Sequence, residues 1–136
     1  MKLTICGSSA FVGDMKEAAD HLSKKGIDCL LPEPLISEAD YAKENGIAKL
    51  LQMKPVFINR HSKKIADSDG ILIINKKRKG FEGYFGSNTL MELAVAFYLG
   101  KKIFLLNPIQ EDHPHYEEIV GLGCMILNGD LDKVEQ

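Results

Sequence analysis

Five short runs of apolar residues, separated by segments with helical character, constrain the fold of this chain more than any other feature. Each run is almost continuously apolar, as expected for strands buried on both faces. The expected strands are Leu3–Cys6, Ile27–Leu31, Ile71–Asn75, Ile103–Leu106 and Met125–Leu127. Strands that alternate with helices predict a parallel sheet covered by helices on both faces. We therefore expect an α/β fold, a flavodoxin-like or Rossmann-like three-layer sandwich with a five-stranded parallel sheet in the order 2-1-3-4-5.

The segments between these strands carry helix signals. Apolar residues recur with a period close to 3.6 between Phe11 and Lys25, and Gly26 is suited to end that helix. A second helix is expected to begin at Pro55, because proline is favoured in a first turn, and to end near Ser68. The other expected elements are weak helical turns in Ser37–Leu51, helices over Thr89–Leu99 and Tyr116–Val120, and a turn over Leu131–Val134. The length of 136 residues fits a single domain, residues 1–136.

Composition and charge argue against several classes of partner. The net charge of −2 gives no reason to expect nucleic acid or an anionic membrane as a partner. The apolar runs are too short to span a bilayer, and the first residues lack the long apolar segment of a signal peptide. The three cysteines, Cys6, Cys29 and Cys124, are odd in number and have no metal-ligand spacing. They are expected to be reduced core residues of a cytoplasmic protein, with no disulfide framework and no metal site.

Polar residues gather where a ligand is expected. In a parallel sheet of this order, ligands bind beyond the carboxyl ends of the strands, between the first and third strands. The turn Gly7-Ser8-Ser9 lies there, and its N–H groups and hydroxyls suit a phosphate or a sugar oxygen. A helix N-cap explains the same serines equally simply. The basic, glycine-rich and aromatic segment Lys76–Gly86 is typical of a flap that closes on a ligand or of a solvated loop.

Glu92 carries the sharpest functional hypothesis. It is a lone carboxylate in an apolar helix that opens after Gly86, Ser87 and Asn88. Near a pocket, such a carboxylate can attack a sugar carbon while a base leaves. Thr89 and Glu92 also fit the capping-box pattern Ser/Thr-x-x-Glu, in which the acid only satisfies its own helix terminus. His61, in the helix before the third strand, is either a packing residue or a proton-transfer group.

Three segments together resemble the nucleoside 2-deoxyribosyltransferase superfamily, which includes the deoxynucleoside-monophosphate N-glycosidases. They are Ile5-Cys6-Gly7-Ser8, Ala66–Ile73, and Gly86–Ala94 followed by Gly100–Ile103. In that superfamily the last block is a glycine-rich turn, a short spacer, the catalytic Glu, an apolar helix, then Gly-Lys and a strand. The order and spacing of these pieces match over roughly residues 1–107.

The resemblance implies both a reaction and a site. Glu92 would be the nucleophile on C1′ of a ribosyl or deoxyribosyl group, without a metal or organic cofactor. The phosphate or sugar hydroxyls would be held by Gly7, Ser8, Ser9, Gly86, Ser87 and Asn88. The ligand would be a nucleoside or nucleotide. The single domain would form a homodimer or a larger homo-oligomer, with a neighbouring subunit completing the pocket.

Two positions depart from the superfamily's pattern. His61 stands where an acid is usual, about two helical turns before Asp69, and a histidine can replace that acid in proton transfer. Gly86 stands where some transferases carry an Asp. The expected chemistry is therefore hydrolysis of an N-glycosidic bond rather than base exchange. A non-catalytic nucleotide-binding or sensor module of the same fold is the first alternative, and an interaction protein without a ligand is the second.

Overall fold

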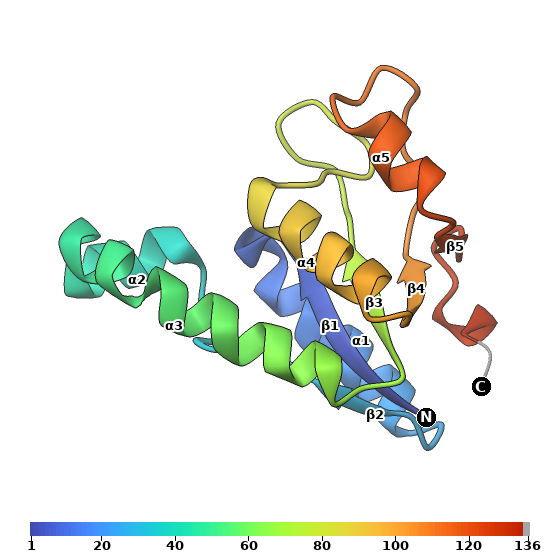
Figure 1. The fold of residues 1–136 in the computed structure, drawn as a ribbon, viewed down its shortest axis with the longest axis horizontal. Coiled ribbons are helices and arrows are strands. Elements are labelled where there is room, and N and C mark those ends of the chain that lie inside the picture. The colour runs from blue at the N-terminus through green and yellow to red at the C-terminus, as the bar shows by residue number, and fades with distance from the viewer. Residues whose placement is uncertain (135–136) are drawn as a thin grey trace.

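A computed structural model describes residues 1–134 of the chain. Figure 1 shows a central sheet with helices on either side. The strands are β1 (Lys2–Gly7), β2 (Asp28–Leu30), β3 (Gly70–Ile74), β4 (Lys102–Leu105) and β5 (Met125–Ile126). All neighbouring pairs are parallel, and the order is β2-β1-β3-β4-β5. The predicted α/β class and strand order are confirmed.

The helices form two layers. They are η1 (Ser9–Phe11), α1 (Val12–Ser23), α2 (Glu38–Asn45), α3 (Ile47–Ala66), α4 (Ser87–Tyr98), α5 (Tyr116–Gly121) and η2 (Leu131–Lys133). Helix α1 packs in one apolar cluster with one face of the sheet, whereas α3, α4 and α5 contribute to the cluster on the other face. None of the helices in residues 1–134 is both long enough and apolar enough to cross a membrane.

The alternation of side chains along β1 assigns its residues to different faces of the sheet. Leu3 and Ile5 belong to the cluster that contains α1, while Cys6 belongs to the cluster that contains α3 and α4. Cys6 is fully buried and is the last residue but one of β1. Its sulfur therefore lies beneath α3 and α4, close to the carboxyl edge of the sheet.

The helix predicted to begin at Pro55 begins instead at Ile47, and that prediction is wrong. Pro55 lies inside α3, where its missing N–H leaves the carbonyl of Leu51 without its helical partner. Both residues are exposed, so water can bond that carbonyl and the helix continues. In Figure 1, α2 and the amino-terminal half of α3 project beyond the sheet. The remainder of α3 covers the sheet and carries His61.

Candidate functional site

Glu92, His61 and Cys6 form one cluster at the carboxyl half of β1. His61 Nε2 lies 2.8 Å from Glu92 Oε2 and 3.4 Å from Cys6 Sγ. The three residues come from α4, α3 and β1, and a donor atom of each lies within 4.8 Å of the others. Side-chain exposure is 9% for His61 and 19% for Glu92. The Glu92 side chain is thus mostly enclosed but not fully buried.

The packing of α3 against α4 brings these residues together. His61 occupies the buried stripe of α3 together with Leu50 and Ile65. Thr89 and Leu93 lie on the buried side of α4, and Glu92 lies next to them, three residues after Thr89 and one before Leu93. The two helices pack side by side on one face of the sheet, so these positions meet at their seam.

The capping-box explanation of Glu92 does not hold. Helix α4 starts at Ser87, two residues earlier than predicted, and its N-cap is Gly86, which has no side chain to bond the helix terminus. Thr89 therefore lies inside the first turn, and its buried Oγ1 has no hydrogen-bond partner among residues 1–134. Glu92 makes its contact with His61 on another helix. An acid that caps its own helix would contact that helix's first backbone N–H groups instead.

The Cys6 thiol is an unreactive group in this setting. Burial, and secondarily the Glu92 carboxylate, raise the pKa of Cys6 well above its usual value of 9.0. A thiol that stays protonated is a poor nucleophile. All three cysteines are free, but only Cys6 is fully buried, whereas Cys29 and Cys124 are half-buried. The expectation that all three are core residues is therefore met fully by Cys6 alone.

A second polar group lies along the same seam. The Glu38 carboxylate, at the start of α2, accepts hydrogen bonds from Lys54 Nζ and from Asn88 Nδ2, the latter at 2.9 Å. The N–H of Glu38 donates to Ser9 Oγ at 2.9 Å, so the turn after β1 is tied to α2. Asn88 lies one helical turn before Glu92. Glu38 therefore links Ser9 to Asn88, both of which were predicted to bind substrate.

Ser8 caps the short helix that follows β1 and also contacts the segment after β3. Its Oγ accepts a bond from the N–H of Ala10, which is the N-cap role considered from sequence. Arg78 Nη1 lies 3.4 Å from the same oxygen, and its guanidinium stacks 5.3 Å from the centre of the Tyr84 ring. This arrangement places a cation beside the turn predicted to hold a phosphate. Ser87 is exposed in the first turn of α4.

Gly7 is needed where β1 approaches β3. Its φ is +147°, and a Cβ there would lie 2.6 Å from the Ile74 carbonyl oxygen. No larger residue fits that contact without moving one of the strands. Gly7 therefore has a structural role in addition to its predicted place in the ligand site.

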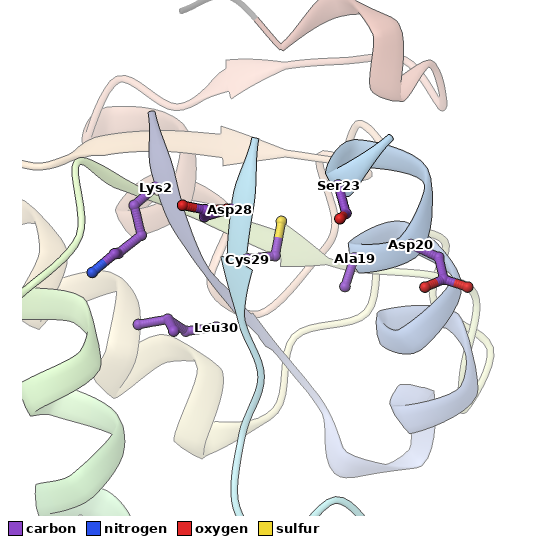
Figure 2. Close-up of a pocket in the computed structure, with 7 residues that line it drawn as sticks. All are labelled: Lys2, Ala19, Asp20, Ser23, Asp28, Cys29 and Leu30. Atoms are coloured by element: carbon purple, nitrogen blue, oxygen red, sulfur yellow. The ribbon is translucent and has the colours of Figure 1, made fainter. Parts of the chain in front are cut away.

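The depression drawn in Figure 2 lies elsewhere. Its volume is about 440 Å³, and its lining residues include Lys2, Asp28 and Leu30, which lie at the amino ends of β1 and along β2. In Figure 2, Lys2, Asp28 and Leu30 lie on one side of the edge strand β2, and the other lining residues, Ala19, Asp20, Ser23 and Cys29, lie on its other side. A second depression, lined by His113 and Tyr116, lies around α5. Neither contains Glu92.

Cys6, Glu38 and Lys54 are neighbours of the site that were not predicted as site residues, whereas Arg78 belongs to the basic segment Lys76–Gly86 that was considered as a flap. The alternation of side chains along β1 places Cys6 on the face of the sheet that α3 covers, and this alternation was the sequence signal that could have indicated its position. The contacts of Glu38 depend on α2, which was expected only as weak turns. The structure brings His61, Asn88 and Glu92 to one seam and leaves Gly7, Ser8 and Ser9 at its border.

Comparisons of the chain with protein-family models, with curated proteins and with solved structures found no match.

Proposed function

We propose that this protein cleaves the N-glycosidic bond of a nucleoside or nucleotide, with Glu92 as the nucleophile. One observation carries the proposal. Glu92 is held by His61 from another helix, near the carboxyl edge of the sheet, and keeps 19% of its side chain exposed. That edge, at the point where the strand order reverses, is where α/β sheets bind ligands. The resemblance to the nucleoside 2-deoxyribosyltransferase superfamily supplies the reaction.

The reaction proceeds in two displacements. A Glu92 carboxylate oxygen forms a bond to C1′ while the C1′–N bond breaks, and the electron pair of that bond goes to the base, which takes up a proton from solvent. Water then attacks C1′ and gives one proton to solvent, the bond from C1′ to Glu92 breaks, and the free sugar and the Glu92 carboxylate are released. The negative charge of Glu92 also stabilises the oxocarbenium character that develops at C1′ in each transition state.

His61 and the neighbouring polar groups have separate roles in this proposal. His61 Nε2 contacts Glu92 directly, which makes it a positioning residue that fixes one carboxylate oxygen. Arg78 and the hydroxyl of Ser8 supply a cation and a hydrogen-bonding group beyond β1, which suit a 5′-phosphate. The sugar would be contacted by the remaining predicted polar residues, Ser9, Ser87 and Asn88.

We also propose that the protein acts as a homodimer. The resemblance to the superfamily implies that a neighbouring subunit completes the ligand site, and Glu92 lines neither depression described above. Apolar side chains are available for such an interface. Ile47 and Leu51 are 62% and 64% exposed on the projecting part of α3, and Tyr98 of α4 is 87% exposed. Light scattering after size exclusion should give twice the chain mass, and Leu51→Glu should shift it toward the monomer. A strictly monomeric wild type would contradict the proposal.

The enzymatic proposal is tested by following base release. Wild type is incubated with ribonucleosides, deoxyribonucleosides and their 5′-monophosphates, and free base is quantified by chromatography. Glu92→Gln keeps the shape of the side chain but removes the nucleophile, so we expect a rate loss of about three orders of magnitude or more. Glu44→Gln, an exposed acid of α2, is the matched control and should keep the wild-type rate.

Binding without turnover gives a different pattern. If wild type releases no base from any compound while a nucleotide raises its melting temperature, the protein is a binding or sensor module. If no compound raises the melting temperature either, an interaction protein is favoured. Base release that persists in Glu92→Gln would remove Glu92 from the mechanism.

A further inference from the structure

The cluster of Cys6, His61 and Glu92 combines three kinds of metal-binding atom. A thiol sulfur, an imidazole nitrogen and a carboxylate oxygen lie within 4.8 Å of one another. Cys6 and His61 are both buried, so two of the three groups are held in place by the surrounding core. Zinc is bound in proteins by these same three side-chain types.

We propose that Cys6, His61 and Glu92 bind one Zn²⁺ ion. A tetrahedral zinc ion with ordinary bond lengths places sulfur and nitrogen about 3.5 Å apart, and nitrogen and oxygen about 3.4 Å apart. The corresponding separations here are 3.4 Å from Cys6 Sγ to His61 Nε2 and 2.8 Å from His61 Nε2 to Glu92 Oε2. The first already fits, and the second requires a movement of about half an ångström, which the flexible side chain of Glu92 can supply.

The charges of the donor set also suit a divalent ion. When zinc binds, the Cys6 thiol loses its proton to solvent, His61 binds as neutral imidazole through Nε2, and Glu92 binds as carboxylate. One thiolate and one carboxylate neutralise Zn²⁺, so the loaded site carries no net charge into the core. The solvent-exposed part of Glu92 provides a route of entry and leaves the fourth position to water.

The site should bind more weakly than a structural zinc site. His61 Nδ1 is buried and has no hydrogen-bond partner among residues 1–134. A ligating histidine usually donates its second N–H to an acceptor, and loss of that acceptor typically costs about 10–100-fold in affinity. The metal is therefore expected to be exchangeable. The binding itself does not rest on the proposed function. If that function holds, zinc occupies the Glu92 carboxylate and inhibits base release reversibly.

Cobalt substitution tests the site spectroscopically. The full-length protein is treated with a chelator, freed of it, and titrated with Co²⁺ and then with Zn²⁺. We expect a thiolate-to-cobalt charge-transfer band that saturates at one equivalent and disappears when Zn²⁺ displaces the cobalt. Cys6→Ala should lose the band, whereas Cys29→Ser and Cys124→Ser should keep it. Glu92→Gln, which is partly exposed and should fold normally, is expected to weaken Co²⁺ binding by about tenfold or more.

Several results would overturn the zinc proposal. They are the absence of a charge-transfer band in wild type, a band that survives Cys6→Ala, or Co²⁺ affinity that is unchanged in Glu92→Gln. Circular dichroism of each variant is the control for retention of the fold. Base release is measured separately with chelator present, because the proposed chemistry uses no metal. If the protein binds cobalt but releases no base, the zinc proposal stands and the enzyme proposal is wrong. If it releases base but shows no cobalt band, the enzyme proposal stands and the zinc proposal is wrong.

Discussion

His61 Nε2 and Glu92 Oε2 lie 2.8 Å apart and join helix α3 to helix α4 across the seam above β1. Both side chains are largely shielded from solvent, so the contact is less screened than a surface pair. When one member of such a pair is removed, the other remains enclosed without its partner, and that is where most of the cost arises.

Replacement of His61 by alanine should lower the free energy of unfolding by about 2–4 kcal/mol, because it opens a cavity and leaves Glu92 without its donor. His61→Gln retains an N–H group of similar reach and should lose less than half as much. Urea unfolding at pH 7 measures both. Equal losses in the two variants would show that volume, not the contact with Glu92, sets the contribution of His61.

Gly7→Ala should destabilise the protein by about 2 kcal/mol or more, because the new Cβ would meet the Ile74 carbonyl oxygen at 2.6 Å and φ is +147°. Gly13 is the matched control. It lies in the first turn of α1, and apart from its chain neighbours and the backbone of its own helix no atom lies within 4 Å of an added Cβ, so Gly13→Ala should stabilise by about 0.5–1 kcal/mol. Thermal unfolding of the two variants should therefore shift in opposite directions. A harmless Gly7→Ala would contradict the close approach of β1 and β3.

Thr89→Val should leave the stability unchanged or raise it by about 1 kcal/mol. The hydroxyl of Thr89 is buried without a partner, and valine fills the same volume without a polar atom. Thr89→Ser keeps the hydroxyl, loses a methyl group and should destabilise. Chemical denaturation measures the difference. A loss of about 1 kcal/mol in Thr89→Val would instead indicate the capping box that the structure lacks.

Stability should fall as the pH is lowered below about 6.5, with His113 as a contributor. Burial, and secondarily the nearby His115, lower the pKa of His113 from its usual value of 6.5, against an opposing effect of Asp112. The unfolded chain then binds more protons than the folded one, so the contribution of His113 is fully present above pH 6.5 and is lost as the pH falls toward its lowered pKa.

The His113→Asn variant isolates this contribution. Its denaturation free energy, measured from pH 7 to pH 5, should change less steeply than that of wild type, although its stability at pH 7 is lower because contacts with the Phe81 and Phe85 rings are lost. Parallel curves for the two proteins would rule out His113 as a source of the pH dependence.

The three central strands, β1, β3 and β4, could be predicted because continuous apolar runs are typical of strands buried on both faces, whereas β5 is exposed and β2 is at most half-buried. Ile71–Ile74 is buried at every position, and no helix within residues 1–134 shows such a pattern. The start of α3 could not be predicted in the same way. Proline usually marks a first turn, and only the exposure of Pro55 and Leu51 lets water replace the missing bond.

The site was only partly predictable. Glu92 stands out as the lone acid of an apolar helix, and His61 was reached by its distance from Asp69 in the superfamily pattern. Their contact with each other, and with Cys6, depends on how α3 and α4 pack on the sheet. Residues 6, 61 and 92 share no local spacing, so no sequence motif could have grouped them.

The alternation of side chains along β1 makes the cluster sensitive to insertions. Adding or deleting one residue between Lys2 and Ile5 would exchange the two faces of the strand's carboxyl half, turning Ile5 toward His61 and sending the sulfur of Cys6 toward α1. An indel of that length would remove the sulfur from beside His61 and Glu92 without changing any residue of α3 or α4. Homologous chains that retain the cluster should therefore keep the length of β1 constant.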